Sequence, residues 1–561
     1  MIRLGSFKGV ALVALAAAIS VGSGDSIAQR RGRGGGGGGG NGGGGGAGEV
    51  MQFGADEADA NAGPAAPPAD GPPSEAMANA LRLYQQERYQ EAAVQFQRVV
   101  EGETGDAPAN VQKAQFHLGK CLYHLRFYQA ALAVFDEIVE RGNAHLYFPS
   151  TLQWLAQLAS QLPEPADIIR RVGRYAPEQL NQFNNSESRT LYNQLLYLLG
   201  RAKYNEGQFD DAVALFRQVQ RASRFYVQAR FFEGISHVRA HHSQPAVDSF
   251  REVQRALDEG VEGVEDPRRM GDLAWLELAR LYYSTNHYSS AVEAWNHVDI
   301  DSEYWLDSLF EESWAYFLQQ DYARALGNVH TLNSPYFANS FYPESLVLKS
   351  VIFFSNCQYD DAETVLAQFA ERYGDLRPEL ERYLQQYQDN TAFFRFLRDV
   401  REGHASLPNR IRPVVEAALG DRTLLRNIEY VSQLEAEERR LAGMPAAFRS
   451  SSVGARILQD ISIAKSFGID TAGDLARSRY QRMLEEIQDL QNQGTAILIE
   501  ILNARRGQLS QEMQEQQTTV QQSLAARVTA DEEHYLWPFN GEFWRDELPF
   551  FRQQVVSRCG R

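Results

Sequence analysis

Small and large apolar residues recur at fixed spacings from residue 76 onward, and this pattern predicts pairs of short amphipathic helices. One copy consists of Gly200, Ala212, Phe216 and Val219. The same four positions return 34 residues later as Gly234, Ala246, Phe250 and Val253. In each copy we expect the small residue of the first helix and the alanine of the second to lie where the two backbones approach closest. The large residue should then fill the seam toward the next copy.

The pattern covers most of the first two thirds of the chain. Further copies begin with the small residues Ala80, Gly119, Ala279, Ser313 and Ser350, and a degenerate copy around Ala156 and Ile168 fills the gap between residues 145 and 190. One helix pair cannot bury its apolar face alone, so successive pairs are expected to stack into a solenoid.

This 34-residue period, with its small residue, alanine and large residue, resembles the tetratricopeptide repeat. The resemblance covers roughly residues 76–375, in seven recognisable units and one degenerate unit. The chain departs from the family because the proline that often ends a unit is mostly missing. The resemblance implies an all-α, tetratricopeptide-type α-solenoid that binds other proteins or peptides.

An aromatic residue follows the small residue by four positions in most units. These residues are Tyr84, Tyr123, Tyr204, Tyr283, Phe317 and Phe354, and Val238 takes the place in the remaining unit. The resemblance implies that this side of the first helix lines a concave groove where partners dock. The alternative is that the rings pack between units, since aromatic side chains serve both cores and interfaces.

The repeat pattern ends at residue 375, and a helical domain is expected over residues 376–530. A charged helix is predicted over 421–442, followed by a longer one over 471–528. The longer helix has a heptad-like seam made of Met483, Ile487, Leu490, Gly494, Ile497, Ile501 and Ala504. We expect this helix to fold back on the earlier helices, with a coiled coil to a partner as the alternative.

The N-terminal segment, residues 1–28, has the organisation of a secretory signal. Arg3 and Lys8 precede an apolar run, and Ser26 to Ala28 form a small-x-small cleavage site, so the mature chain is expected to begin near Gln29. The Gly- and Pro-rich residues 29–74 are expected to form a disordered tether before the solenoid at 75–375. The sequence therefore predicts a periplasmic or otherwise exported protein with no transmembrane segment after signal cleavage.

Motifs for catalysis or metal binding are not evident. There is no P-loop, HExxH, GxSxG or CxxC pattern, and His241-His242 and Asp531 to His534 are interpreted as solvated polar residues. The formal net charge of −17 disfavours a nucleic-acid partner. The three cysteines, Cys121, Cys357 and Cys559, do not indicate a disulfide scaffold, so packing is expected to stabilise the fold, with pairing of Cys559 as an open alternative. We therefore expect a non-catalytic protein without a cofactor or metal.

The C-terminal segment, residues 531–561, is unusually aromatic. It is expected either to cap exposed apolar surface of the long helix or of the final repeats, or to dock a partner through Trp537 and Trp544. Together with Tyr342 to Glu344 and Asn356 to Ala362, it resembles exported repeat proteins of myxobacteria, including those of the gliding motility machinery.

These observations together predict a periplasmic scaffold for envelope proteins, in a motility or envelope-spanning complex. The alternative is an accessory protein or enzyme of cell-wall metabolism with a site in the C-terminal domain. Such an enzyme would require a buried cluster of carboxylates or histidines in that domain.

Overall fold

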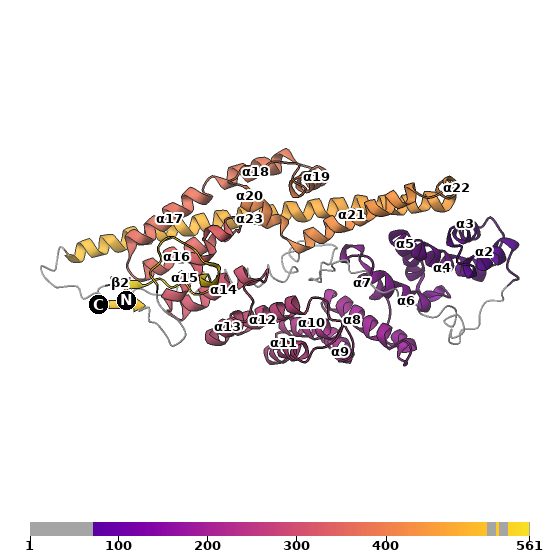
Figure 1. The fold of residues 1–561 in the computed structure, drawn as a ribbon, viewed down its shortest axis with the longest axis horizontal. Coiled ribbons are helices and arrows are strands. Elements are labelled where there is room, and N and C mark those ends of the chain that lie inside the picture. Colours follow the sequence, from indigo (N-terminus) through magenta and orange to yellow (C-terminus); the bar gives the residue numbers. More distant parts are fainter. Residues whose placement is uncertain (1–70, 513–522, 527–536, 560–561) are drawn as a thin grey trace.

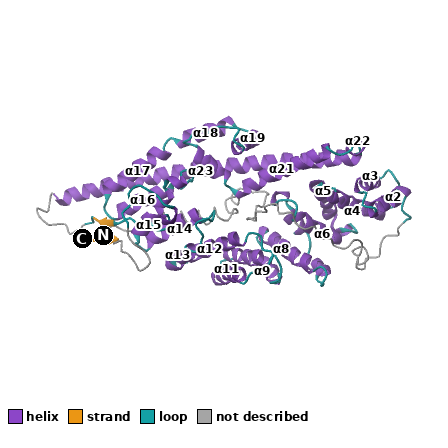
Figure 2. Cartoon of the chain, viewed as in Figure 1, coloured by secondary structure: helices purple, strands orange, loops and turns teal. Residues whose placement is uncertain are grey.

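The computed structural model describes residues 71–512, 523–526 and 537–559, and helices dominate this part of the chain (Figures 1 and 2). The repeat helices are α2 (Glu75–Gln85), α3 (Tyr89–Val100), α4 (Pro108–His124), α5 (Tyr128–Arg141), α6 (Phe148–Ala159), α7 (Ile168–Val172), α8 (Arg189–Asn205), α9 (Phe209–Gln218), α10 (Tyr226–Arg239), α11 (Ser243–Asp258), α12 (Pro267–Ser284), α13 (Tyr288–Trp295), α14 (Trp305–Leu318), α15 (Tyr322–Leu332), α16 (Glu344–Ser355) and α17 (Tyr359–Tyr373). The later helices are α18 (Leu376–Gln386), α19 (Asn390–Arg401), α20 (Arg412–Leu419), α21 (Arg422–Ala442), α22 (Ala446–Arg449) and α23 (Ser452–Glu512). Short 3-10 helices are η3 (Gly142–Ala144), η4 (Glu164–Ala166), η5 (Pro177–Phe183), η6 (Pro335–Phe337) and η7 (Arg545–Glu547), and the strands are β1 (Ser523–Ala526) and β2 (Val555–Ser557).

The repeat helices pair in sequence order, from α2 with α3 to α16 with α17, and form the α-solenoid that the repeat pattern predicts (Figure 1). The degenerate unit is the pair α6 and α7, in which the second helix is reduced to Ile168–Val172 and the 3-10 helix η4 precedes it. No helix in the described part of the chain combines the length and apolarity that a membrane span requires.

Each recognisable pair turns through one residue with a left-handed backbone, at φ between 55° and 77°. These residues are Glu87, Arg126, Gly207, His241, Asn286, Gln320 and Cys357. In the first unit the N–H of Glu87 donates to the carbonyl oxygen of Tyr84 at 2.9 Å, and the N–H of Arg88 donates to that of Leu83 at 3.0 Å. These bonds satisfy carbonyl groups at the end of the first helix, as in a Schellman-type ending.

Glycines of the first helices allow the second helices to pack closely. A Cβ at Gly119, Gly200 or Gly234 would come within 2.6 Å of the ring sixteen residues later, in Phe135, Phe216 or Phe250. In these three units the small residue of the first helix therefore makes room for the large residue of the second helix. The ring of Phe216 also contacts Phe232 of the next unit, at 6.1 Å between centroids, so the large residue packs both within and between units.

The long helix α23 begins nineteen residues before the predicted start at Thr471. Gly454, Gly468 and Gly473 lie in this region, and each marks a close contact with a neighbouring segment of the chain. A Cβ at Gly468 would lie 3.2 Å from Val431 of α21, and one at Gly473 would overlap the main chain of Asn390 in α19. The predicted extension to residue 528 is also wrong, because residues 523–526 form strand β1, which pairs antiparallel with β2.

Helices α21 to α23, which we call the bridge hairpin, connect the two ends of the solenoid (Figure 1). The start of α23 and the short α22 contact the first units at α3 and α5, whereas the later part of α23 contacts α16 to α19. The predicted seam faces these helices: Met483, Ile487 and Ile501 are fully or almost fully buried. The seam residues therefore pack against other helices of the same chain, as expected for a long helix that folds back on the earlier helices.

Candidate interaction surface

Side-chain contacts join the bridge hairpin to the second unit of the solenoid. The hydroxyl of Tyr430 donates to Oε1 of Gln129 at 2.7 Å, and the main-chain N–H of Gln129 donates to Oε1 of Glu437 at 3.2 Å. The ring of Phe448 stacks on that of Phe127 at 6.5 Å between centroids. The junction is therefore both polar and apolar.

The carboxyl group of Glu437 should make this junction sensitive to pH. Burial raises its pKa from 4.5 to about 7, although hydrogen bonds from the main-chain N–H groups of Gln129 and Tyr128 oppose the shift. A raised pKa means that the folded state holds the proton more tightly, so the contribution is complete below about pH 4.5 and is lost as the pH rises through about 7. We expect the free energy of unfolding to fall between pH 6 and pH 8.

The Glu437→Gln variant should show a smaller loss of stability over that interval, measured by urea unfolding at the two pH values. The slope should decrease without vanishing, because burial also raises the pKa of Glu312 to about 7 and that of Glu344 to about 8. Glu103→Gln, at an exposed pair with Arg98, provides the matched control. An unchanged slope in Glu437→Gln would contradict this assignment.

The six predicted groove aromatics lie at the turns between paired helices. Each ring contacts the aromatic ring five residues later, with centroids 5.3 to 6.0 Å apart. These contacts join Tyr84 to Tyr89, Tyr123 to Tyr128, Tyr204 to Phe209, Tyr283 to Tyr288, Phe317 to Tyr322 and Phe354 to Tyr359. In every unit with an aromatic residue at this position, the ring therefore packs against a second ring in a similar geometry, as the packing alternative predicts.

Burial differs along this row. Tyr204 and Tyr283 are only 6% and 5% exposed, while the other four rings are half-buried. Contacts also run to the following unit, since Tyr123 meets Trp154 at 5.2 Å and Tyr204 meets Phe232 at 6.0 Å. A role in partner binding stays a prediction for this row.

Replacement of Tyr283 by alanine should lower the free energy of unfolding by about 3–5 kcal/mol, as truncation of a buried aromatic typically does. Chemical denaturation of the purified protein measures this effect. Tyr336→Ala is the matched control, because Tyr336 is 55% exposed and its truncation should cost much less. A folded Tyr283→Ala variant of undiminished stability would refute the packing role.

The described part of the C-terminal segment lies against α15, near the end of the solenoid. The hydroxyl of Thr331 donates to the carbonyl oxygen of Leu548 at 2.5 Å, and the N–H of Gln553 donates to that of Ala323 at 3.1 Å. Gly327 lies between these two contacts, and a Cβ there would overlap the carbonyl group of Phe551. A glycine inside a predicted helix was the one sequence signal for this approach, and it was missed.

Apolar residues of the segment complete the attachment. Leu548 is 2% exposed and packs in a cluster with Trp305, Leu309 and Leu332, which come from α14 and α15. Val555 is fully buried in the main core. The cap expected from the sequence is therefore present, and it covers the α14–α15 unit.

A disulfide between Cys357 and Cys559 fixes the end of the segment. Cys357 occupies the left-handed turn position of the last unit, and the N–H of Arg558 donates to the carbonyl oxygen of Asn356 at 2.9 Å. Packing is thus not the only source of stability, and the alternative in which Cys559 pairs is confirmed. The two cysteines are 202 residues apart, and their neighbours in the sequence do not indicate that they pair.

Four aromatic side chains of the docked segment remain at the surface, and we call them the aromatic ridge. Trp537 is 81% exposed and Trp544 58% exposed, and Phe539 and Phe550 are each about half exposed. Next to the ridge, Arg545 pairs with Asp301 in the loop before α14. The two predicted tryptophan anchors are therefore held on a fixed segment with their rings accessible.

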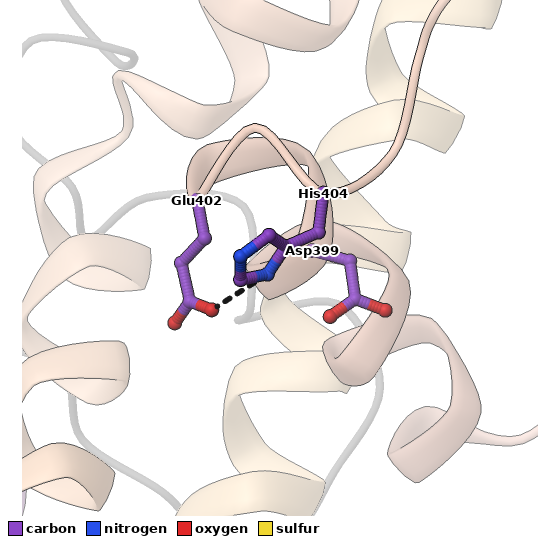
Figure 3. Close-up of side chains that lie close together, drawn as sticks. All are labelled: Asp399, Glu402 and His404. Carbon is purple, nitrogen blue, oxygen red and sulfur yellow. Dashed lines mark ion pairs between the residues drawn. The ribbon is translucent and has the colours of Figure 1, made fainter.

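One group of possible metal ligands lies at the end of α19 (Figure 3). The ligand atoms of Asp399, Glu402 and His404 lie within 4.8 Å of one another, and Nδ1 of His404 is 3.3 Å from Oε2 of Glu402. All three side chains are exposed, as exposed acidic residues often are without a metal. No motif in the sequence marks this group, and its geometry is that of a surface contact between His404 and Glu402.

Two other polar groups are interpreted from the sequence as solvated residues. His241 and His242 are exposed at a turn between paired helices, whereas Asp531 to His534 lie outside the described residues. Buried carboxylates do occur, but they have packing partners: Glu311 accepts from Nη2 of Arg280 at 2.7 Å, and Glu312 accepts from Nδ2 of Asn328 at 2.7 Å. These contacts join α14 to α12 and to α15.

Comparisons with known proteins agree with this architecture. The family model of the tetratricopeptide repeat matches residues 77–145 and 197–261, which contain the paired helices α2 to α5 and α8 to α11. No curated protein sequence matches the chain. Among solved structures, the apo form of RapI has 14% sequence identity, covers 56% of this chain and 91% of its own, and has a TM-score of 0.31. With their repeat period, their stacked helix pairs and the match to the family model, these two regions of the chain contain tetratricopeptide repeats.

Proposed function

We propose that this protein is an exported, non-catalytic scaffold that binds other proteins of the cell envelope through its aromatic ridge. Tetratricopeptide repeats serve protein interaction, and the solenoid gives the ridge a rigid base. The observation that carries the proposal is the exposure of Trp537 and Trp544 on a segment held by buried residues, main-chain hydrogen bonds and a disulfide. Tryptophan side chains are common anchors of protein interfaces, and a docked segment loses less conformational freedom on binding than a free one.

Two features support export. The first is the secretory organisation of residues 1–28. The second is the disulfide between Cys357 and Cys559, since structural disulfides persist in oxidising compartments and are rare in the cytosol of most cells. Membership of an envelope-spanning or gliding motility assembly remains a prediction from the sequence resemblance.

Photo-crosslinking in the native cell tests the binding role. A photoreactive phenylalanine analogue at position 537 should give a discrete adduct with an envelope protein, whereas the same analogue at Phe467 should not. Phe467 is a suitable control because it is 67% exposed but lies on α23. Replacing both Trp537 and Trp544 with alanine should weaken binding of the crosslinked partner by about 30-fold or more, the effect typical of interface hot spots.

Fractionation tests export separately. The mature protein should begin near Gln29 and should contain the oxidised Cys357–Cys559 pair when free thiols are trapped at lysis. Recovery of intact Met1 with both cysteines reduced would contradict export. Equal adducts at positions 537 and 467, or unchanged binding by the double variant, would contradict the role of the ridge.

A further inference from the structure

A small hollow lies where α15, α16 and α17 meet the docked C-terminal segment. Its volume is about 200 Å³, and its lining includes His330 and Asn333 of the α15 end, Lys349 of α16, Arg372 of α17 and Phe543 of the segment. Val329 and Leu346 complete an apolar side. The hollow therefore has cationic groups on one side and apolar groups on the other.

Its positive charges lack acidic partners. Lys349 is half-buried and forms no ion pair among the described residues, and Arg372 donates only to Oδ1 of Asn333, at 3.1 Å, besides lying over the ring of Tyr373. No carboxylate of the described residues lines the hollow. Lys349 stands out in a chain whose net charge is −17, because charges removed from water are usually paired, whereas Arg372 is exposed and its guanidinium is accessible to an anion.

The imidazole of His330 adds a polar atom without a partner. Its Nε2 is buried and makes no hydrogen bond, while rings of Phe539, Phe543 and Phe551 surround the imidazole at 4.7 to 5.0 Å. Burial and the nearby charge of Lys349 lower its pKa, which favours the neutral imidazole. Burial also lowers the pKa of Lys349, as expected when no anion compensates its charge.

We propose that this hollow binds a phosphate group of a small phosphorylated molecule. Its two positive charges match a phosphate dianion better than a carboxylate, and the guanidinium, ammonium, amide and imidazole groups are the donors that phosphate accepts. The volume is below the roughly 300–1,000 Å³ of typical drug-sized ligand sites, so only the phosphate and a short organic stem would enter. Phe539 of the aromatic ridge contacts His330 in this site, whereas Trp537 and Trp544, which carry the proposed function, do not line it.

Calorimetric titration with inorganic phosphate, glycerol 3-phosphate and succinate tests the assignment on the full chain. We expect both phosphates to bind and succinate to bind at least about tenfold more weakly, because its charges are spread over two carboxylates. Tighter binding of glycerol 3-phosphate would identify an organic phosphate as the natural group, whereas equal affinities would identify free phosphate. Equal binding of succinate would overturn the proposal.

Lys349→Met should weaken phosphate binding by roughly tenfold or more, since charge-assisted hydrogen bonds contribute that much. In phosphate-free buffer the variant should melt at or above the temperature of the wild type, because it no longer contains an unpaired half-buried charge. Phosphate should raise the Tm of the wild type but not of the variant. Lys113→Met removes the same charge from a half-buried lysine of the first repeats and should leave binding unchanged. Unchanged affinity in a folded Lys349→Met variant would refute the site.

Discussion

Replacement of Cys559 by serine should lower the free energy of unfolding by about 2–5 kcal/mol and should release the end of the C-terminal segment. The disulfide closes a loop of 202 residues, so its loss restores conformational freedom mainly to the unfolded chain. Leu548, Gln553 and Val555 could still make their contacts without the disulfide. Each of these contacts contributes less free energy than the conformational entropy that the chain end gains when it is released.

Urea unfolding and limited proteolysis together measure this effect. Cys357→Ser should reproduce Cys559→Ser, and the double variant should be no less stable than either single one. A reductant should bring the wild type to the same level without changing the variants. If reduction leaves the unfolding midpoint and the protease resistance of residues 537–559 unchanged, then the disulfide does not stabilise the fold.

Gly327→Val separates the attachment of the segment from the disulfide. The new side chain would overlap the carbonyl group of Phe551, so the segment must move away from α15 while Cys559 stays bonded. This variant should expose residues near Leu548 to protease and shift the fluorescence of Trp544. Gly327→Val displaces the segment from α15 but leaves the disulfide intact, whereas the cysteine variants release the end of the segment. Comparing them therefore separates the effect of the packing contacts from that of the disulfide.

Replacement of Glu164 by alanine should destabilise the protein by about 3–5 kcal/mol, the usual cost of breaking a buried ion pair by removing one partner. Glu164 lies in the degenerate unit and accepts from Nη2 of Arg201 at 2.5 Å and from Nη1 of Arg426 at 2.6 Å. Arg201 and Arg426 are only 4% and 8% exposed. One carboxylate thus compensates two buried arginines, one in α8 and one in the bridge hairpin.

Urea unfolding at neutral pH measures the loss. Glu91→Ala removes a carboxylate from an exposed ion pair with Arg88 and should change stability by less than about 1 kcal/mol. A variant with Glu164→Leu, Arg201→Met and Arg426→Met should recover much of the stability, because it contains no buried charge. Equal effects of Glu164→Ala and Glu91→Ala would show that the buried arrangement contributes little.

The sequence predicts the solenoid well because its signal is repeated. Gly200 and Gly234 recur with the same aromatic partners, so the unit can be recognised before any contact is known. It also locates the degenerate unit, but not the importance of Glu164, whose partner Arg426 is 262 residues away. Contacts between such distant residues have no periodic signature.

The C-terminal half is predicted less completely for the same physical reason. The start of α23 is misplaced because the heptad-like seam begins only at Met483, whereas the helix already begins at Ser452 and packs against α21 and α19. Only part of the candidate surface can be predicted from the sequence. Trp537 and Trp544 stand out because the segment around them is unusually aromatic. The attachment of this segment through Thr331 and Cys357 depends on tertiary contacts that leave no local pattern.

The bridge hairpin has a consequence for how the repeats unfold. An open array of repeats frays from its terminal units, because each terminal unit has only one neighbour. Here the same helix, α23, contacts α3 and α5 at one end of the array and α16 and α17 at the other. Neither end can peel away without breaking contacts that also hold the opposite end, so the solenoid should resist stretching and lose its structure in one cooperative step.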